Sequence, residues 1–202
     1  APLITTASGK KFGKTESGAV WLDPEMTSPY QFYQFWINTE DADVARYLRM
    51  FTFMPRAEIE SLETAHAKAP HERGAQKALA TAMTTLLHGA DASRVATEVS
   101  RVIFDKKIDA SAIGDDVYAT LAAEIPSVKY PGAPELNVLD VLEGAFELSR
   151  GAGRKLIQQG GVSVNGEKLS AESLTVPRGK AVRGRWFLVR KGGRDIALAD
   201  VR

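Results

Sequence analysis

Two lysines near the start of the chain have the residue type and spacing to neutralise a polyphosphate. Lys11 and Lys14 lie in the segment SGKKFGKTESG, residues 8–18, and the hydroxyl of Thr15 follows directly. A lysine ammonium is a compact charge on a flexible stem, so it can reach the oxygens of a leaving phosphate group. The same composition is typical of a solvated basic loop, and the pattern alone leaves both interpretations open.

The glycines of this segment do not form a P-loop. A P-loop has four residues between its two glycines, whereas three residues separate Gly9 from Gly13. A P-loop also leads directly into a helix, but Gly18 and Pro24 interrupt the residues that follow. The lysine side chains, rather than a cradle of backbone amides, are therefore the candidate phosphate ligands.

The end of the chain holds a second candidate site, which is basic. Residues 150–202 contain 12 Lys or Arg against 4 Asp or Glu, whereas residues 1–149 contain 14 against 21. A basic segment on an acidic body is typical of nucleic-acid binding. The expected RNA ligands surround the start of a helix, where free backbone N–H groups also favour phosphate. They are Ser149, Arg150, Arg154 and Lys155. A second basic cluster, Arg178, Lys180, Arg183 and Arg185, fits RNA contact and simple surface charge equally well.

These residues require two kinds of fold to position them. Residues 1–27 contain the loop and a connector, and residues 28–125 predict an all-α bundle of five or six helices. Ser28-Pro29 is a helix start, the aromatic helix after it is expected to be buried, and further helices are expected at 56–66, 72–88, 92–104 and 115–124. The segment IPSVKYPGAPE, residues 125–135, is typical of an interdomain linker, and the linker is placed at 126–135. Residues 136–202 predict a small α+β domain, with a hairpin turn at Asn165-Gly166.

Composition excludes several classes of protein. The chain has no cysteine, which rules out disulfides and thiolate metal sites, and its 44% hydrophobic content is ordinary for a globular protein. No apolar run approaches the roughly 18 residues of a membrane helix, so we expect a cytoplasmic protein with no membrane partner and no metal site. The chain starts at Ala1 without an initiator Met, which suggests a fragment or a processed piece.

The segment KFGKT resembles the lysine-rich signature loop of class I aminoacyl-tRNA synthetases, usually written KMSKS. The residues that follow, TESGAVWLD and TSPYQFYQFWINTEDADV, are similar to bacterial tyrosyl-tRNA synthetases in particular. The resemblance implies catalytic roles for Lys11, Lys14 and Thr15, with Lys14 as the main ATP contact. It implies that the loop stabilises the departing pyrophosphate while tyrosyl-adenylate forms, and that ATP, with Mg²⁺, is a substrate of the whole enzyme.

The resemblance extends over the rest of the chain. It implies that residues 28–125 are the helical anticodon-binding domain. It also implies that residues 136–202 are an RNA-binding domain of the S-four type, in which ELSRGAGRKLIQQGGVSVNGEKL is the helix-loop-helix segment. The implied partners are tRNA(Tyr), the catalytic domain of the same enzyme and a second copy in a homodimer.

The family's Rossmann-like catalytic core has no counterpart in these residues, because no H-x-G-H tetrapeptide occurs and nothing before residue 28 could form a parallel sheet. The chain thus resembles the C-terminal half of a tyrosine–tRNA ligase, an enzyme that activates tyrosine with ATP and transfers it to tRNA. Alone it is expected to bind tRNA, hold no cofactor and catalyse no adenylation. The alternative is a freestanding S-four-type RNA-binding module with a helical scaffold, which would have no use for the segment KFGKTESGAVWLDP.

Overall fold

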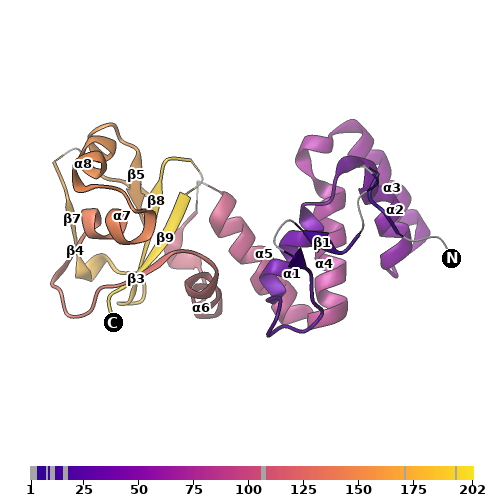
Figure 1. Ribbon diagram of the computed structural model, residues 1–202, viewed down its shortest axis with the longest axis horizontal. Helices are drawn as coiled ribbons and strands as arrows, with labels where there is room; N and C mark the ends of the chain where they lie inside the picture. Colours follow the sequence, from indigo (N-terminus) through magenta and orange to yellow (C-terminus); the bar gives the residue numbers. More distant parts are fainter. Residues whose placement is uncertain are drawn as a thin grey trace. The chain divides into compact units, whose positions relative to one another are not determined.

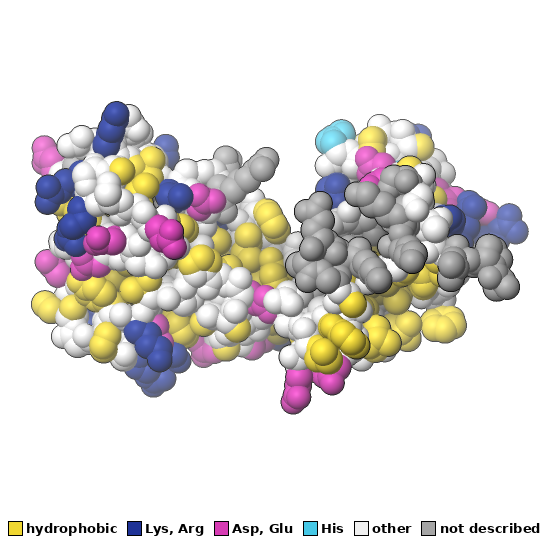
Figure 2. Space-filling model, viewed as in Figure 1, with side chains coloured by type: hydrophobic (Ala, Val, Ile, Leu, Met, Phe, Trp, Pro, Cys, Tyr) yellow, Lys and Arg dark blue, Asp and Glu magenta, His cyan; other side chains and the backbone are white. Residues whose placement is uncertain are grey.

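The chain folds into two compact units, Ala1–Thr97 and Glu98–Arg202, which we call the first and the second unit (Figure 1). The computed structural model describes residues 4–7, 9, 12–15, 18–105, 108–170, 172–193 and 195–202. Figure 2 shows several Lys and Arg side chains, in dark blue, on the part of the second unit where α8 lies in Figure 1. Each unit is described by itself below.

The first unit is helical. Its elements are β1 (Lys14–Thr15), β2 (Gly18–Ala19), α1 (Pro29–Ile37), α2 (Asp41–Phe51), α3 (Arg56–Lys68), the 3₁₀ turn η1 (Pro70–Glu72), α4 (Gly74–His88) and the start of α5 (Ala90–Phe104). The hydroxyl of Ser28 accepts a hydrogen bond from the backbone N–H of Gln31 at 3.1 Å, which confirms the predicted helix start. Tyr30, Phe32, Tyr33 and Trp36 are buried, which confirms that the aromatic helix belongs to the core.

The second unit combines helices with a small mixed sheet. After the end of α5 its elements are η2 (Ala110–Ala112), α6 (Asp115–Glu124), β3 (Ser127–Lys129), β4 (Glu135–Asn137), α7 (Val138–Phe146), α8 (Arg150–Gln158), β5 (Val162–Val164), β6 (Glu167–Lys168), β7 (Thr175–Pro177), η3 (Arg178–Lys180), β8 (Trp186–Lys191) and β9 (Asp195–Asp200). The five-stranded sheet has the order β3-β9-β8-β5-β6, and β4 pairs with β7 in a separate ladder. Strand β3 runs parallel to β9, and the other neighbours are antiparallel.

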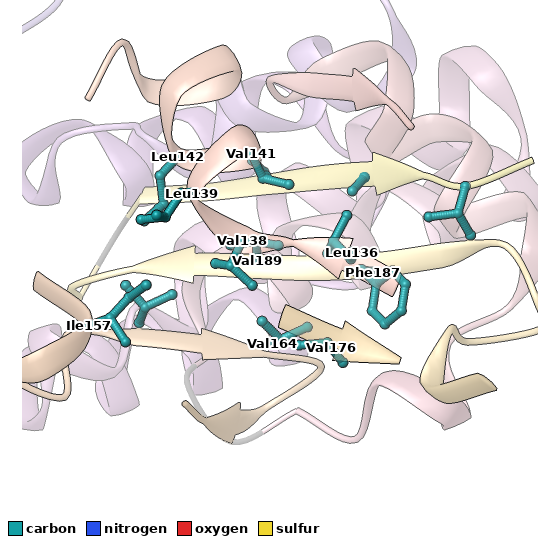
Figure 3. Close-up of a cluster of buried hydrophobic side chains, with 14 of the residues drawn as sticks. Leu136, Val138, Leu139, Val141, Leu142, Ile157, Val164, Val176, Phe187 and Val189 are labelled. Carbon is teal, nitrogen blue, oxygen red and sulfur yellow. The ribbon is translucent and has the colours of Figure 1, made fainter. Parts of the chain in front are cut away.

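The core of the second unit forms where α7 and α8 cover the sheet. Leu139 and Leu142 of α7, Ile157 of α8 and Phe187 and Val189 of β8 are almost fully buried together (Figure 3). Alternate residues of a strand point to the same face of a sheet, so Phe187 and Val189 both reach this core. Burial of these apolar side chains holds α8 in place, and with it the basic residues that α8 carries.

The proline-rich segment is part of the second unit and does not join two domains. Ser127 pairs with Leu198 in the β3–β9 ladder, and β4 pairs with β7. The division between the units lies instead after Thr97, within α5. The prolines do not disturb the strands, because Pro126 precedes β3 while Pro131 and Pro134 lie between β3 and β4, where no ladder N–H is lost.

Helix α6, expected in the helical bundle, also belongs to the second unit. The ring of Tyr118 stacks on that of Trp186 in β8, with centroids 5.8 Å apart and planes inclined by 4°. The Tyr118 hydroxyl donates to the carbonyl of Ala110 at 2.9 Å, and burial raises the pKa of Tyr118 to about 12. Across the described residues, the helices are too short or too polar to cross a membrane.

Candidate functional site

The backbone just before the lysine loop is bound to helix α2. The N–H of Ala7 donates to both carboxylate oxygens of Asp43, at 3.0 and 2.9 Å. Asp43 is only 3% exposed. Arg46, one turn further along α2, donates to the carbonyl of Thr5 and lies 3.5 Å from the Asp43 carboxylate. Two neighbouring side chains of one helix therefore hold residues 5–7.

Phe12, the second residue of the KFGKT segment, is also held by the helices. The ring of Phe12 lies among four aromatic rings of α1 and α2, with centroid distances of 5.0 to 5.6 Å: those of Phe35, Trp36, Tyr47 and Phe51. Offset and edge-to-face contacts at such distances are favourable beyond simple burial. Phe12 therefore attaches the segment to the core of the first unit.

The expected phosphate ligands lie next to this anchor. Lys11 lies outside the described residues. Lys14 and Thr15 form β1, in which Lys14 pairs with Ala19 and Thr15 with Gly18. The N–H of Val20 donates to the carbonyl of Gly13 at 3.2 Å and extends this small hairpin. The structure thus defines the backbone of two of the three residues expected to act on phosphate.

An open cleft of about 880 Å³ lies between this hairpin and the first two helices. Its lining is mixed: Phe12 and Trp21 contribute apolar surface, whereas Gln34, Asn38 and Asp43 contribute amide and carboxylate groups. Beyond the hairpin, the N–H of Trp21 donates to the Thr27 hydroxyl at 2.9 Å. In the part of the chain that the structure describes, no group of three His, Cys, Asp or Glu side chains is arranged to hold a metal ion.

In the second unit, the expected RNA ligands of α8 divide into paired and unpaired groups. Ser149 caps the helix, accepting from the N–H of Ala152 at 3.3 Å. Arg150 donates to Asp140 of α7 at 2.7 Å and lies 3.5 Å from Glu143. The hydrogen bond to Asp140 is the main cause of a raised Arg150 pKa. Ser149 and Arg150 therefore already serve the packing of α7 and α8.

Arg154 and Lys155 are the unpaired basic residues of α8. Both side chains are exposed, and within the described residues neither forms an ion pair. They lie in the middle of a helix whose opposite side, with Gly153 and Ile157, is buried. Their positive charges thus face solvent, where an anionic partner can reach them.

The second basic cluster is engaged inside the unit. Arg183 lies 3.2 Å from Asp115 and donates to the carbonyl of Ile113 at 3.0 Å. Arg185 donates to both oxygens of Asp200, at 3.0 and 2.7 Å, and its guanidinium stacks 4.0 Å from the Trp186 ring. The Arg185 hydrogen bond is the main cause of the lowered pKa of Asp200. Both arginines hold elements of the second unit together, near α6 and β9.

The remaining pair of this cluster lies around η3. Lys180 lies 3.6 Å from Glu167 of β6, and Arg178 is half-buried. The four residues form a cluster in the sequence because of their spacing, but spacing carries no information on their acidic partners. Asp43 was not among the expected site residues either. An acidic residue in the first turn of a helix ordinarily complements the helix dipole, so nothing local distinguishes the one that binds Ala7.

Two family models match the chain. The family model described as "tRNA synthetases class I (W and Y)" matches residues 1–105. The model described as "Tyrosine--tRNA ligase SYY-like C-terminal domain" matches residues 117–199. The two matches together span both units and include the lysine loop and α8.

Individual proteins show the same similarity. The chain is 42% identical over 201 residues to the tyrosine–tRNA ligase of Streptomyces avermitilis and 44% identical over 202 residues to that of Nocardia farcinica. These alignments cover 99% and 97% of this chain but 47% of each relative, so the chain spans about half the length of the curated relatives it matches. A solved, C-terminally truncated mitochondrial tyrosyl-tRNA synthetase of Aspergillus nidulans is 42% identical, with a TM-score of 0.43 over 45% of this chain and 25% of that chain. The chain belongs to the class I tRNA synthetase family for W and Y.

Proposed function

We propose that the chain is the tRNA-binding and loop-bearing part of a tyrosine–tRNA ligase. The whole enzyme would activate tyrosine with ATP to tyrosyl-adenylate and transfer the tyrosyl group to tRNA(Tyr), acting as a homodimer. The observation that carries the proposal is the pair Arg154 and Lys155, which α8 holds exposed and without ion-pair partners among the described residues. The tyrosine–tRNA ligase identity of the relatives supports it.

The electrostatics of α8 suit an RNA backbone. Lys and Arg side chains that neutralise phosphates release condensed counterions, which makes the affinity depend strongly on salt. Arg150 is tied to Asp140, so its guanidinium is oriented rather than free. We assign phosphate contact first to Arg154 and Lys155, with Ser149 and Arg150 at the rim of the contact. Arg183 and Arg185 would contact RNA only through what their internal ion pairs leave exposed.

The KFGKT segment would act on ATP in the catalytic half of the enzyme. In this role Lys11 and Lys14 neutralise charge as pyrophosphate leaves, and Thr15 assists at the same phosphates. Mg²⁺ would arrive with ATP as part of the substrate. The anchored Phe12 and the β1–β2 hairpin support this role, because a phosphate-binding lysine needs a defined backbone beneath it. The 202-residue chain alone is expected to show no tyrosine-dependent ATP–pyrophosphate exchange.

Filter binding of the chain to transcribed tRNA(Tyr) across a salt series tests the RNA part. The variant Arg154→Gln/Lys155→Gln is expected to lower the affinity and to reduce the slope of log K against log salt by about 1.5, since each lost phosphate contact removes about 0.7 to 0.9. The matched control is Lys129→Gln/Arg202→Gln, which removes the same charge at the exposed β3–β9 edge. Equal losses in both variants would mean that only net charge matters and would reject the α8 site.

A non-cognate tRNA provides the second comparison. A tyrosine–tRNA ligase part is expected to bind tRNA(Tyr) more tightly than a tRNA of another specificity at the same salt concentration. Equal affinity for both RNAs would favour a general RNA-binding module and would contradict the proposed function.

A further inference from the structure

We propose that Asp43, assisted by Arg46, is a positioning residue for the KFGKT loop. The inference rests on the proposed function and goes beyond it, because it assigns the positioning of the loop to two side chains in the first turns of α2. Asp43 touches no phosphate in this scheme. It acts through the backbone of residues 5–7.

Burial makes the Asp43 carboxylate a costly group that needs compensation. It is 3% exposed, and an ionised carboxylate away from water is destabilising unless it is hydrogen-bonded and paired. Its compensation comes from the Ala7 N–H, which both oxygens accept, and from the Arg46 guanidinium at 3.5 Å. The Asp43 carboxylate is therefore fully stabilised only while the backbone of residues 5–7 lies in this position.

Arg46 connects the same strand a second time. Its guanidinium donates to the carbonyl of Thr5 and packs over the Tyr47 ring, 5.3 Å from the centroid. The carbonyl of Thr5 and the N–H of Ala7 are thus recognised together by two side chains one helical turn apart. A sliding of the strand by one residue would lose both contacts.

We call the contacts of Asp43 with Ala7 and of Arg46 with Thr5 the clamp. Two backbone hydrogen bonds lie next to it. The N–H of Phe12 donates to the carbonyl of Ile4 at 3.3 Å, and the N–H of Gly9 donates to the carbonyl of Thr6 at 2.9 Å. The segment that enters the loop and the segment that leaves it are therefore bonded to each other. Any displacement of residues 5–7 is transmitted to Phe12 and to the β1 residues that follow it.

Helix α2 holds both segments. It supplies Asp43 and Arg46 to the entering segment and Tyr47 and Phe51 to Phe12, with ring centroids 5.0 and 5.1 Å away. The position of Lys14 relative to the helices is thus set by four side chains from consecutive turns of one helix. This links the loop that meets ATP to the domain expected to bind tRNA.

The test compares Asp43→Asn with Asp41→Asn. Both variants remove one negative charge from the first turn of α2, but among the described residues the partners of Asp41 are Gln76, which donates to it at 2.6 Å, and His66 at 3.6 Å, rather than residues 5–7. In the 202-residue chain, NMR hydrogen exchange at the Ala7 amide is expected to speed up about tenfold in Asp43→Asn, as one hydrogen bond weakens. In Asp41→Asn the Ala7 amide should exchange as fast as in the unmodified chain.

The catalytic readout uses the full-length ligase of which the chain is proposed to be a part. Asp43→Asn is expected to lower kcat for ATP–pyrophosphate exchange by about 10- to 100-fold, the usual effect of displacing a reacting group by about 1 Å. The KM for tyrosine and the single-turnover transfer of tyrosine from preformed adenylate to tRNA should stay unchanged. A merely structural role would lower kcat and the transfer rate and raise the KM for tyrosine together.

The outcomes separate the two proposals. If the full-length protein exchanges pyrophosphate and Asp43→Asn behaves like Asp41→Asn, the positioning role is overturned while the ligase function stands. If the unmodified full-length protein shows no exchange, the proposed function fails and the catalytic role of Asp43 fails with it. Unchanged exchange of the Ala7 amide in Asp43→Asn would overturn the clamp whatever the activity.

Discussion

Arg190 should be among the most sensitive residues for the stability of the second unit. It lies in β8, is 8% exposed, and donates to three carbonyls: Ile103 at 2.9 Å, Val102 at 2.8 Å and Asp105 at 3.0 Å. The last carbonyls of a helix lack partners within it, and a cation there also meets the negative end of the helix dipole. Burial lowers the pKa of Arg190, so its charge is held in place by these contacts against its own desolvation.

The size of the effect follows from the number of bonds. Arg190→Met keeps an apolar stem of similar length but donates nothing, so the buried carbonyls of Val102 and Ile103 and the part-buried carbonyl of Asp105 lose a charged donor. At about 1.5 kcal/mol for each such bond the loss is about 4 to 5 kcal/mol, and removing a desolvated charge returns about 1 to 2 kcal/mol of it. We therefore expect a net destabilisation of about 3 kcal/mol. Arg190→Lys keeps the charge but not the planar fork, and should lose about half as much.

The loss of stability is measured by urea unfolding of the 202-residue chain. Hydrogen exchange of peptides from each unit follows the unfolding. Separate readouts are needed because two units need not unfold in a single transition. For an m-value of about 1.5 kcal/mol/M, a loss of 3 kcal/mol moves the midpoint of the second unit by about 2 M. The midpoint of peptides before residue 90 should stay in place.

Two results would refute this reasoning. A shift for Arg190→Met below about 0.3 M, equal to about 0.5 kcal/mol, would mean that water replaces the guanidinium at the helix end without cost. A variant Arg190→Lys as unstable as Arg190→Met would show that the charge contributes nothing and that only the fork geometry matters.

Three further predictions concern single positions. In α8, Gly151→Ala should stabilise the second unit by about 0.5 to 1 kcal/mol because open space surrounds the new Cβ, whereas Gly153→Ala should destabilise it by about 1 to 2 kcal/mol because its Cβ would lie 3.0 Å from a leucine methyl of α7; thermal unfolding compares the two. Asn165→Ala should cost about 2 kcal/mol in urea unfolding. The Asn165 side chain accepts from a β8 N–H at 2.8 Å and donates to an η3 carbonyl at 3.0 Å, and its backbone has a φ of 51°. Burial lowers the folded-state pKa of His88, so its contribution to stability is present above its ordinary pKa of about 6.5 and is lost as the pH falls through the folded value; between pH 7.5 and 5.5 the first unit should lose more stability than its His88→Gln variant, and parallel pH profiles would contradict this.

Local signals in the sequence were sufficient for most helices and for one hairpin. Helices expected at 56–66, 72–88, 92–104 and 115–124 are observed as Arg56–Lys68, Gly74–His88, Ala90–Phe104 and Asp115–Glu124. Asn165 and Gly166 both have positive φ, at 51° and 88°, and join β5 to β6 as expected. Caps, turn residues and apolar spacing act within a few residues, so they can be recognised without knowing the fold.

Pairing between distant residues could not be predicted in the same way. Strand β3 has three residues and becomes a strand only because β9 lies beside it. Its proline-rich surroundings predicted a linker on composition, which does not register a parallel partner. The same limit placed Tyr118 in the helical bundle, since nothing near it in the sequence reveals its stacking on Trp186.

The candidate site shows the same division. The spacing around Ser149 predicted a helix start, and the Ser149 hydroxyl caps α8. Charge type and exposure of Arg154 also follow from the amphipathic pattern of this helix. The acidic partners of Arg150 and Arg185 lie on other elements, at Asp140 and Asp200, and only the folded chain reveals that these charges are already used.

The parallel pairing of β3 with β9 has a consequence for synthesis on the ribosome. Ser127 finds its neighbour only once Leu198 has been made, and at about 5 to 20 residues per second the interval is on the order of several seconds. During that time the α7–α8 pair and the early strands are present while β9, which lies between β3 and β8, is missing. Through most of this interval the apolar face of α7 has neither β8 nor β9 to pack against, and the edges of β3 and β8 that β9 joins stay unpaired until β9 is made. The second unit therefore needs protection from aggregation while it is synthesised.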